Sequence, residues 1–408
     1  MKNKFTKYIF KQNEYKVLYK RLLFTCLILF IYILGSNISL IAENGVQKQD
    51  NTFYKIAVSN MGGDIHTLNI FSLGLGPWLT ALIFFSLLAY KNMDKASRQT
   101  RKEKHYKEKI LTLVLSIIQG YFVIHEYVIK DKIHSENIFI LLLVIVTGTM
   151  LLVWLADQNV RYGVAGPMPI VLMSIVKSLF QQKLATLHTS TLILVFIVAA
   201  IVVALFILLV MELIEYRINY RDIMNFENQE IKKYLAWKIN PAGSISIMIS
   251  VSVFIILNNV LNLLLSMTIQ HKDIPIQLLT FNNATGITLY MFLQIILGYL
   301  LSRFILNTKN KSKDFLRSGN YFVGIQPGEA TERFLNKKAR KICWIGSIIV
   351  ACIIAVPLYS TLFVPQLAQQ IYFAIQLIVL VYIGINIAET IKTYLYFDKY
   401  KRFLNKYW

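Results

Sequence analysis

The feature that most constrains this chain is a series of apolar runs, each close to twenty residues long. A helix needs about 20 apolar residues to cross the roughly 30 Å hydrocarbon core of a bilayer. Ten such runs follow one another, and the sequence therefore predicts an all-α polytopic membrane protein with ten transmembrane helices. The predicted spans are approximately 22–42, 69–90, 110–129, 137–156, 167–181, 189–211, 241–265, 284–306, 342–363 and 366–389.

The distribution of basic residues tests this topology. The chain carries a net charge of +21 and is only 16% charged, against about 25% in soluble domains. With the N-terminus in the cytoplasm, the inside segments hold 35 Lys and Arg residues and the outside segments hold six. Cytoplasmic loops carry such an excess, so we expect a cell-membrane protein with both ends inside. The charge is explained by topology, and no nucleic-acid partner is needed.

Catalytic patterns are lacking in the sequence. The cysteines Cys26, Cys343 and Cys352 all lie in apolar runs, the six histidines are dispersed, and there is no Walker A motif. No charged residue lies near the middle of a span, and Lys177 is close enough to a span end for its amine to extend to the surface. Ion-coupled transporters generally need midplane groups. We therefore expect no enzyme, no cofactor, no metal site and no ion-coupled transporter.

Two segments outside the spans differ from simple connectors. Residues 1–21 alternate basic with aromatic and aliphatic residues, which indicates an amphipathic helix on the cytosolic membrane surface. Residues 43–68 contain an apolar patch at 53–58 and the pair Gly62 and Gly63. Such a segment could fold back into a cavity, since irregular backbone is tolerated at membrane depth where protein surrounds it. A disordered outer loop is the alternative.

Four stretches, in order, resemble the SecY family, the central subunit of the protein-conducting channel. They are IFSLGLGPWL at 70–79, YLAWKINPAG at 234–243, SGNYFVGIQPGEAT at 318–331 and, more loosely, IKTYL at 391–395. The resemblance covers nearly the whole chain and agrees with the span count. It implies two five-helix halves, 22–181 and 182–408, related as an inverted repeat around a central pore and hinged near 181–188.

The same resemblance implies residue roles inside the channel, although ordinary packing or lipid contact is the alternative for any single residue. The implied apolar pore ring consists of Leu75, Leu79, Met168, Leu172, Ile245, Met248 and Val379. The implied plug, at about 51–66, includes Phe53, Ile56, Val58, Gly62 and Gly63. A polar cluster at a lateral gate between spans two and three and spans seven and eight would consist of Gln119, Asn258 and Asn259.

By the same resemblance, the cytosolic loops 212–240 and 307–341 bind the partner that drives translocation, a SecA-type ATPase or a ribosome. Two glycines and a proline at 324–328 predict a turn in the second loop. The implied contact residues are Arg217, Gln326, Pro327, Gly328, Glu329 and Arg333. Further implied partners are SecE-type and other small accessory Sec subunits, a secretory preprotein and membrane lipid.

Three departures from the family pattern indicate which branch of the family this chain resembles most. Gln326 stands where the family has arginine, residues 373–376 replace the usual GGTS, and the 212–240 loop is short. These features make the chain more similar to the accessory SecY paralogue of Gram-positive cocci, which works with a dedicated SecA paralogue and exports serine-rich glycosylated adhesins. The alternatives are a divergent housekeeping SecY and an unrelated polytopic transporter.

Overall fold

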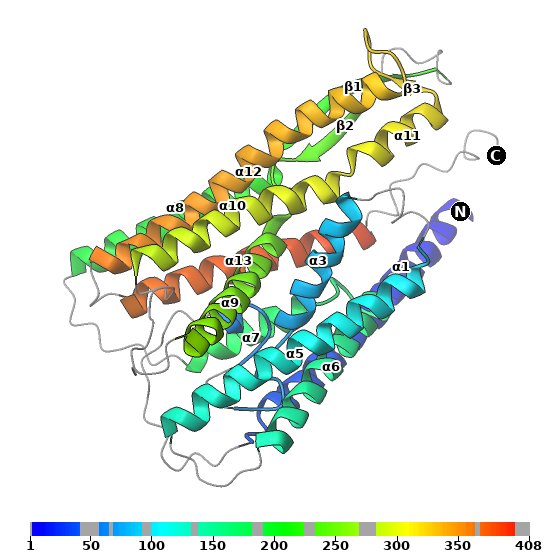
Figure 1. Ribbon diagram of the computed structural model, residues 1–408. Helices are drawn as coiled ribbons and strands as arrows, with labels where there is room; N and C mark the ends of the chain where they lie inside the picture. The colour runs from blue at the N-terminus through cyan, green and yellow to red at the C-terminus, as the bar shows by residue number, and fades with distance from the viewer. Residues whose placement is uncertain are drawn as a thin grey trace. The chain divides into compact units, whose positions relative to one another are not determined.

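The computed structural model describes residues 2–40, 57–64, 68–91, 99–131, 138–181, 191–223, 233–268, 283–363 and 368–395. Across these residues the protein is almost entirely helical (Figure 1). A helix overlaps every one of the ten predicted spans, and six of these helices are long and apolar enough to cross a membrane on the described residues alone. The helices that overlap the spans are α1 (Lys2–Ser36), α3 (Gly76–Lys91), α5 (Arg101–Asp131), α6 (Ile138–Tyr162), α7 (Met168–Gln181), α8 (Thr191–Leu213), α9 (Gly243–Thr268), α10 (Ala284–Leu306), α12 (Glu329–Phe363) and α13 (Ala368–Leu395).

The chain forms two compact units. The first contains Met1–Trp78, Lys109–Lys183 and Val379–Trp408, and the second contains Leu79–Glu108 and Leu184–Ile378. One boundary between the units lies at 183/184, close to the predicted division between the two halves. The inverted repeat itself stays a prediction.

In the first unit, α1 packs against α6 and α7. The helix α1 is continuous from Lys2, so no break separates the amphipathic N-terminal stretch from the first span. A buried apolar cluster joins the turn before α3 to α5 and α6. Its members are Leu68, Leu73, Val123, Ile124, Leu141 and Ile145.

That turn is a correction to the second predicted span, which was expected to be helical from residue 69. Residues 70–75 form turns instead, and α3 begins at Gly76. Gly74 has a left-handed backbone with φ 60°, which a side chain would strain. The glycine-rich stretch therefore ends the turn and precedes the helix.

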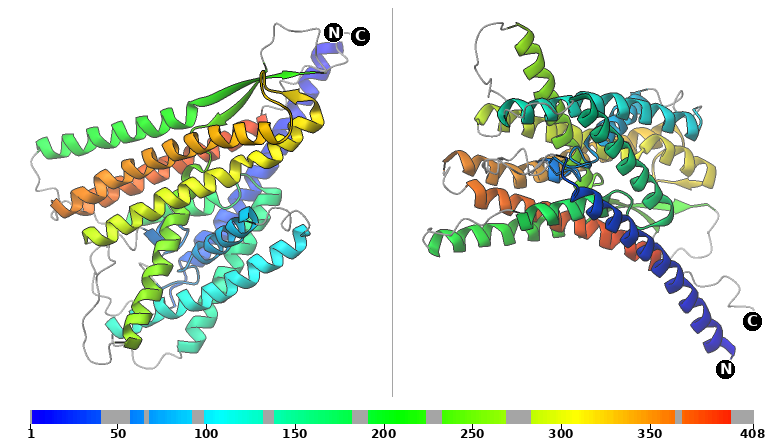
Figure 2. Two further views of the ribbon diagram at one scale, coloured as in Figure 1. Left: turned by 45° about the horizontal axis from the view of Figure 1, so that its top comes forward. Right: turned by 90° about the horizontal axis from the view of Figure 1, so that it is seen from below.

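In the second unit, α10 packs against α9 and α12, and the short helix α11 (Thr308–Ser318) packs against α12 (Figure 2). The first third of α12 is polar and the remainder is apolar. Hydropathy detects only the apolar part, which is why the predicted span began at 342 while the helix begins at Glu329.

A small antiparallel sheet completes the second unit. Its strands are β1 (Glu215–Asp222), β2 (Lys233–Lys238) and β3 (Asn320–Tyr321), in the order β2-β1-β3. The register pairs Tyr216 with Trp237 and Arg221 with Tyr321. These strands are a correction to the loop expected over 212–240. The missed signal is the alternation of inward and outward residues along β1.

Candidate partner-docking site and plug

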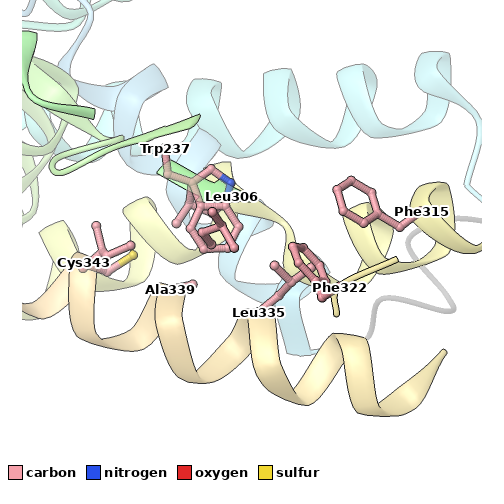
Figure 3. Packing of buried hydrophobic residues seen from close by; sticks show 9 residues of the cluster. Trp237, Leu306, Phe315, Phe322, Leu335, Ala339 and Cys343 are labelled. Atoms are coloured by element: carbon pink, nitrogen blue, oxygen red, sulfur yellow. The ribbon is translucent and has the colours of Figure 1, made fainter. Parts of the chain in front are cut away.

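The two predicted docking loops form a single body with its own apolar core. Residues of β1 and β2 pack against α11, the turn after it and the polar part of α12 (Figure 3). We call this body, β1 to β3 with 307–341, the platform. Its buried core consists of Ile218, Trp237, Leu306, Phe315, Phe322, Leu335, Ala339, Ile342 and Cys343. A partner that contacts one loop therefore meets a fixed arrangement of both.

Aromatic rings dominate this core. The ring of Phe322 stacks on Phe315 with centroids 5.2 Å apart and lies 5.3 Å from Phe334. Phe315 also meets Tyr220 of β1 at 5.1 Å. Aromatic side chains bury large areas with defined geometry, so these contacts hold the turn after α11 in place.

The predicted turn at Gln326–Gly328 is confirmed. Gly324 and Gly328 have φ angles of 78° and 103°, which only glycine adopts without strain. The hydroxyl of Thr331 donates to the carbonyl of Gln326 at 3.0 Å, and the hydroxyl of Ser312 donates to the carbonyl of Gly328, also at 3.0 Å. These bonds fix the backbone of the turn at 324–328, which we call the tip of the platform, to α11 and α12. The side chains of Gln326 and Pro327 are exposed.

The remaining predicted contact residues also lie on the platform surface. Glu329 and Arg333 form an ion pair at 3.2 Å, but both side chains are more than 80% exposed, so the pair contributes little stability. Arg217 is exposed on β1 and lies over the ring of Tyr234 at 4.5 Å from its centroid. The predicted docking residues are thus accessible to a partner.

In the first unit, the described part of the predicted plug is buried. We call residues 57–64 the plug segment; every one of them is buried, including Val58, Gly62 and Gly63. Phe53 and Ile56 lie outside the described residues. The backbone N–H of Leu75, a predicted ring residue, donates to the carbonyl of Met61 at 2.8 Å. The plug segment therefore lies directly against one member of the predicted pore ring.

Two glycines allow this close approach. A Cβ atom at Gly63 would lie 2.5 Å from the carbonyl oxygen of Ser72, and one at Gly74 would overlap the backbone of Gly62 and Gly63. Backbone packs on backbone here, so no side chain is tolerated on either side.

The other predicted channel residues are divided between the two units. Leu75 and Val379 are buried in the first unit, where Met168 and Leu172 are half-buried. The second unit contains the ring residues Leu79, Ile245 and Met248, of which Leu79 and Met248 are buried. Gln119 is in the first unit, and Asn258 and Asn259 are in the second. The pore ring and the lateral-gate cluster stay predictions.

The contacts of Lys177 differ from the sequence-based expectation. Its amine does not extend to a surface but lies 2.9 Å from the carboxylate of Asp64 and 2.7 Å from the carbonyl of Ser36. The sequence does contain two residues of opposite charge that could pair: a lysine inside an apolar run and an aspartate just after Gly62 and Gly63. Their proximity is a long-range fact that one sequence does not reveal.

A second missed network lies at the start of α7. The side chain of Asn159 accepts from the Thr25 hydroxyl at 2.9 Å and donates to the carbonyls of Val164 and Gly166 at 3.1 and 2.5 Å. This network fixes the Gly- and Pro-rich entry to the helix. Within the described residues, no three His, Cys, Asp or Glu side chains gather where they could hold a metal ion.

Comparisons with known proteins give consistent results. The family model for SecY matches residues 69–388. The chain is 58% identical over 400 residues to an "Accessory Sec system protein translocase subunit SecY2" of Staphylococcus aureus strain Newman, covering 98% of this chain and 99% of that protein. A protein of the same description from Staphylococcus pseudintermedius strain ED99 is also 58% identical, over 408 residues and all of both chains.

The fold has solved counterparts as well. One structure, described as "The plug domain of the SecY protein stablizes the closed state of the translocation channel and maintains a membrane seal", superposes with a TM-score of 0.66. It is 15% identical in sequence, and the match covers 95% of each chain. At that identity the likeness shows the fold alone.

Proposed function

This chain belongs to the SecY family, and from that premise we propose that it is the central channel subunit of an accessory Sec translocase. In this role it passes unfolded secretory proteins across the cytoplasmic membrane. The observation that carries the proposal is the 58% identity to subunits of that description over nearly the whole chain. The most specific cargo class we propose is serine-rich glycosylated adhesins.

The channel mechanism requires no bond-making step by this chain. We propose that the apolar ring forms a constriction that lets an unfolded chain slide without binding it and that blocks ions by dewetting. The plug segment closes the same constriction in the resting state. Its contact with Leu75, through the hydrogen bond from Leu75 N–H to Met61, supports both assignments together.

The driving force in this proposal comes from a SecA-type ATPase that docks on the platform. The basic residues of 212–240 and 307–341 support a cytoplasmic position for the platform by the positive-inside rule, and we propose that both termini lie on that side as well. The exposed, uncharged Gln326 at its tip favours a dedicated motor over the general one. SecE-type and other small subunits, the preprotein and membrane lipid complete the proposed partners, and nucleic acid is not among them.

A crosslink to a stalled secretory chain tests the channel role. Cys26 and Cys352 are exposed and would be replaced by serine, whereas Cys343 is buried and stays. A cysteine introduced at Leu75 is expected to crosslink to an adhesin precursor held in the translocase. The matched control is a cysteine at Phe139, whose side chain is 74% exposed on α6. No crosslink at Leu75 in an engaged complex contradicts the channel assignment.

Motor choice tests the accessory role separately. We expect Gln326→Arg to strengthen binding to the housekeeping SecA and to weaken binding to the dedicated motor. The control is Leu316→Arg, which adds the same charge at a 57% exposed position on α11. Binding of both motors to membranes containing each variant would be measured. Tight binding of the housekeeping motor to the unaltered protein contradicts the accessory role and leaves the channel role intact.

A further inference from the structure

Four consecutive residues at the end of the plug segment are each held by a separate polar contact. The donors come from three different elements: the turn before α3, α1 and α7. The contacts run from Leu75 N to Met61 O at 2.8 Å, from Tyr32 Oη to Gly62 O at 3.0 Å, from Ser174 Oγ to Gly63 O at 2.7 Å, and from Lys177 Nζ to Asp64 Oδ2 at 2.9 Å.

The last of these contacts joins two charges in a poorly hydrated place. The side chain of Asp64 is 6% exposed and that of Lys177 is 19% exposed. Lys177 also donates to the carbonyl and the hydroxyl of Ser36, at 2.7 and 3.1 Å. Two hydrogen bonds to Ser36 and the charge of Asp64 therefore hold the ammonium group in this position. If the plug segment were displaced without water entering, each charge would stay buried without the other, which is strongly unfavourable.

The residues that make these contacts share one face of each helix: Tyr32, Ser174 and Lys177 donate, and Ser36 accepts from Lys177. Ser174 and Lys177 are three residues apart on α7, and Tyr32 and Ser36 are four apart on α1, so each pair projects from the same side of its helix. A shift of α7 by a few ångströms therefore breaks the contacts to Gly63 and Asp64 at the same time. The plug segment is sensitive to the position of a helix that supplies two of the predicted ring residues, Met168 and Leu172.

We propose that Lys177 and Asp64 form an ionic latch that keeps the plug segment seated until α7 moves. The proposal rests on the proposed channel function and specifies how its closed state is held. Attraction between the two charges is strong while the site is dry. When the pore fills with water, both charges are hydrated and the attraction falls, so opening leaves no buried unpaired charge.

The test is the ion leak of the full-length protein, in its translocase complex, reconstituted into lipid vesicles. Lys177→Met and Asp64→Asn are each expected to raise the leak about tenfold or more, since losing 1.4 kcal/mol from the closed state multiplies the open population by ten. The double variant is expected to leak no more than the stronger single variant, because both changes remove one contact. Additive effects indicate general damage to packing and overturn the latch.

Two controls make the outcomes decisive. Lys109 pairs with Asp157 at 3.0 Å in the same unit, and Lys109→Met is expected to leave the leak unchanged. Deletion of 57–64 measures the leak of a channel without the plug segment. If the deletion variant leaks ions but Lys177→Met and Asp64→Asn do not, the latch is overturned and the plug assignment stands. If the deletion variant inserts normally into the membrane and shows no raised ion leak, the plug assignment is overturned, and the latch with it. The crosslink at Leu75 tests the channel role independently.

Discussion

The guanidinium of Arg303 on α10 donates two hydrogen bonds to Asn336 on α12, an arrangement that we call the clasp. Its Nη2 donates to the side-chain Oδ1 of Asn336 at 2.9 Å, and its Nη1 donates to the backbone carbonyl of the same residue at 3.3 Å. The hydroxyl of Thr308, at the start of α11, donates to the same Oδ1. One amide oxygen thus joins the end of α10, the start of α11 and the polar part of α12, so it determines how the platform continues from the helices beneath it.

We predict that Asn336→Ala lowers the free energy of unfolding by about 2–3 kcal/mol, because it leaves a charged group that is 8% exposed without one of its acceptors. Thermal unfolding of the detergent-solubilised protein measures this change. Lys337→Ala, at the exposed neighbouring position, is the control and is expected to be near neutral. Equal stability of the two variants contradicts a structural role for the clasp.

The platform core gives a second prediction. Phe315→Ala is expected to cost about 3–5 kcal/mol, since it removes a buried ring that contacts Phe322 and Tyr220. The fluorescence of Trp237, which lies in the same cluster, is expected to change, and the turn at 322–328 is expected to become sensitive to protease. Leu316→Ala, 57% exposed on the same helix, should alter neither signal. A protease-resistant Phe315→Ala variant shows that the core does not hold the tip.

The membrane-spanning part of this fold is largely readable from the sequence. The span predicted at 284–306 coincides with α10 (Ala284–Leu306), and the others differ mainly at their ends. This success has a physical cause: a bilayer requires every spanning backbone to satisfy its own hydrogen bonds, so length and hydropathy suffice to find the helices. The Gln326–Gly328 turn was predictable for a similar reason, because proline and glycine restrict the local backbone directly.

Contacts between distant residues were not predictable in this way. The pairing of β1 with β2 and β3, the Lys177 and Asp64 ion pair, and the clasp of Arg303 by Asn336 all depend on which segments meet in space. Each polar partner taken alone resembles an ordinary loop or span-end residue. Family resemblance predicted that these two loops bind a partner, but it did not indicate that one aromatic core joins them.

The surface of β1 gives a third prediction. Arg217→Ala is expected to weaken binding of the SecA-type motor several-fold, because its guanidinium is exposed and held in place over the Tyr234 ring. Binding to inverted membrane vesicles measures the effect, which should be larger at low salt. Asn219→Ala, exposed on the same face of the strand, is the matched control. A loss of equal size in both variants indicates damage to the strand and not the loss of a contact.

The entry to α7 gives a fourth prediction. Asn159 is completely buried, and its amide group donates to two carbonyls while its oxygen accepts from Thr25. Asn159→Asp keeps the acceptor but loses both donors, so we expect it to be destabilised at least as much as Asn159→Ala, by about 2–3 kcal/mol. Thermal unfolding compares the two variants with Val160→Ala, which changes an exposed side chain. A stable Asn159→Asp variant contradicts the need for the donors.

The close approach of Gly74 to the plug segment gives the last prediction. At φ 60° any side chain costs about 1–2 kcal/mol, and a Cβ here would also overlap the backbone of Gly62 and Gly63. Gly74→Ala should therefore displace the plug segment and raise the ion leak without altering any charge. Gly120→Ala is the control, because its Cβ would lie 3.5 Å from Leu73 in ordinary contact and inside a helix, where alanine is favoured. If Gly74→Ala is inserted normally and does not leak, the seated plug segment does not depend on this backbone contact, and the seal must come from its side-chain contacts alone.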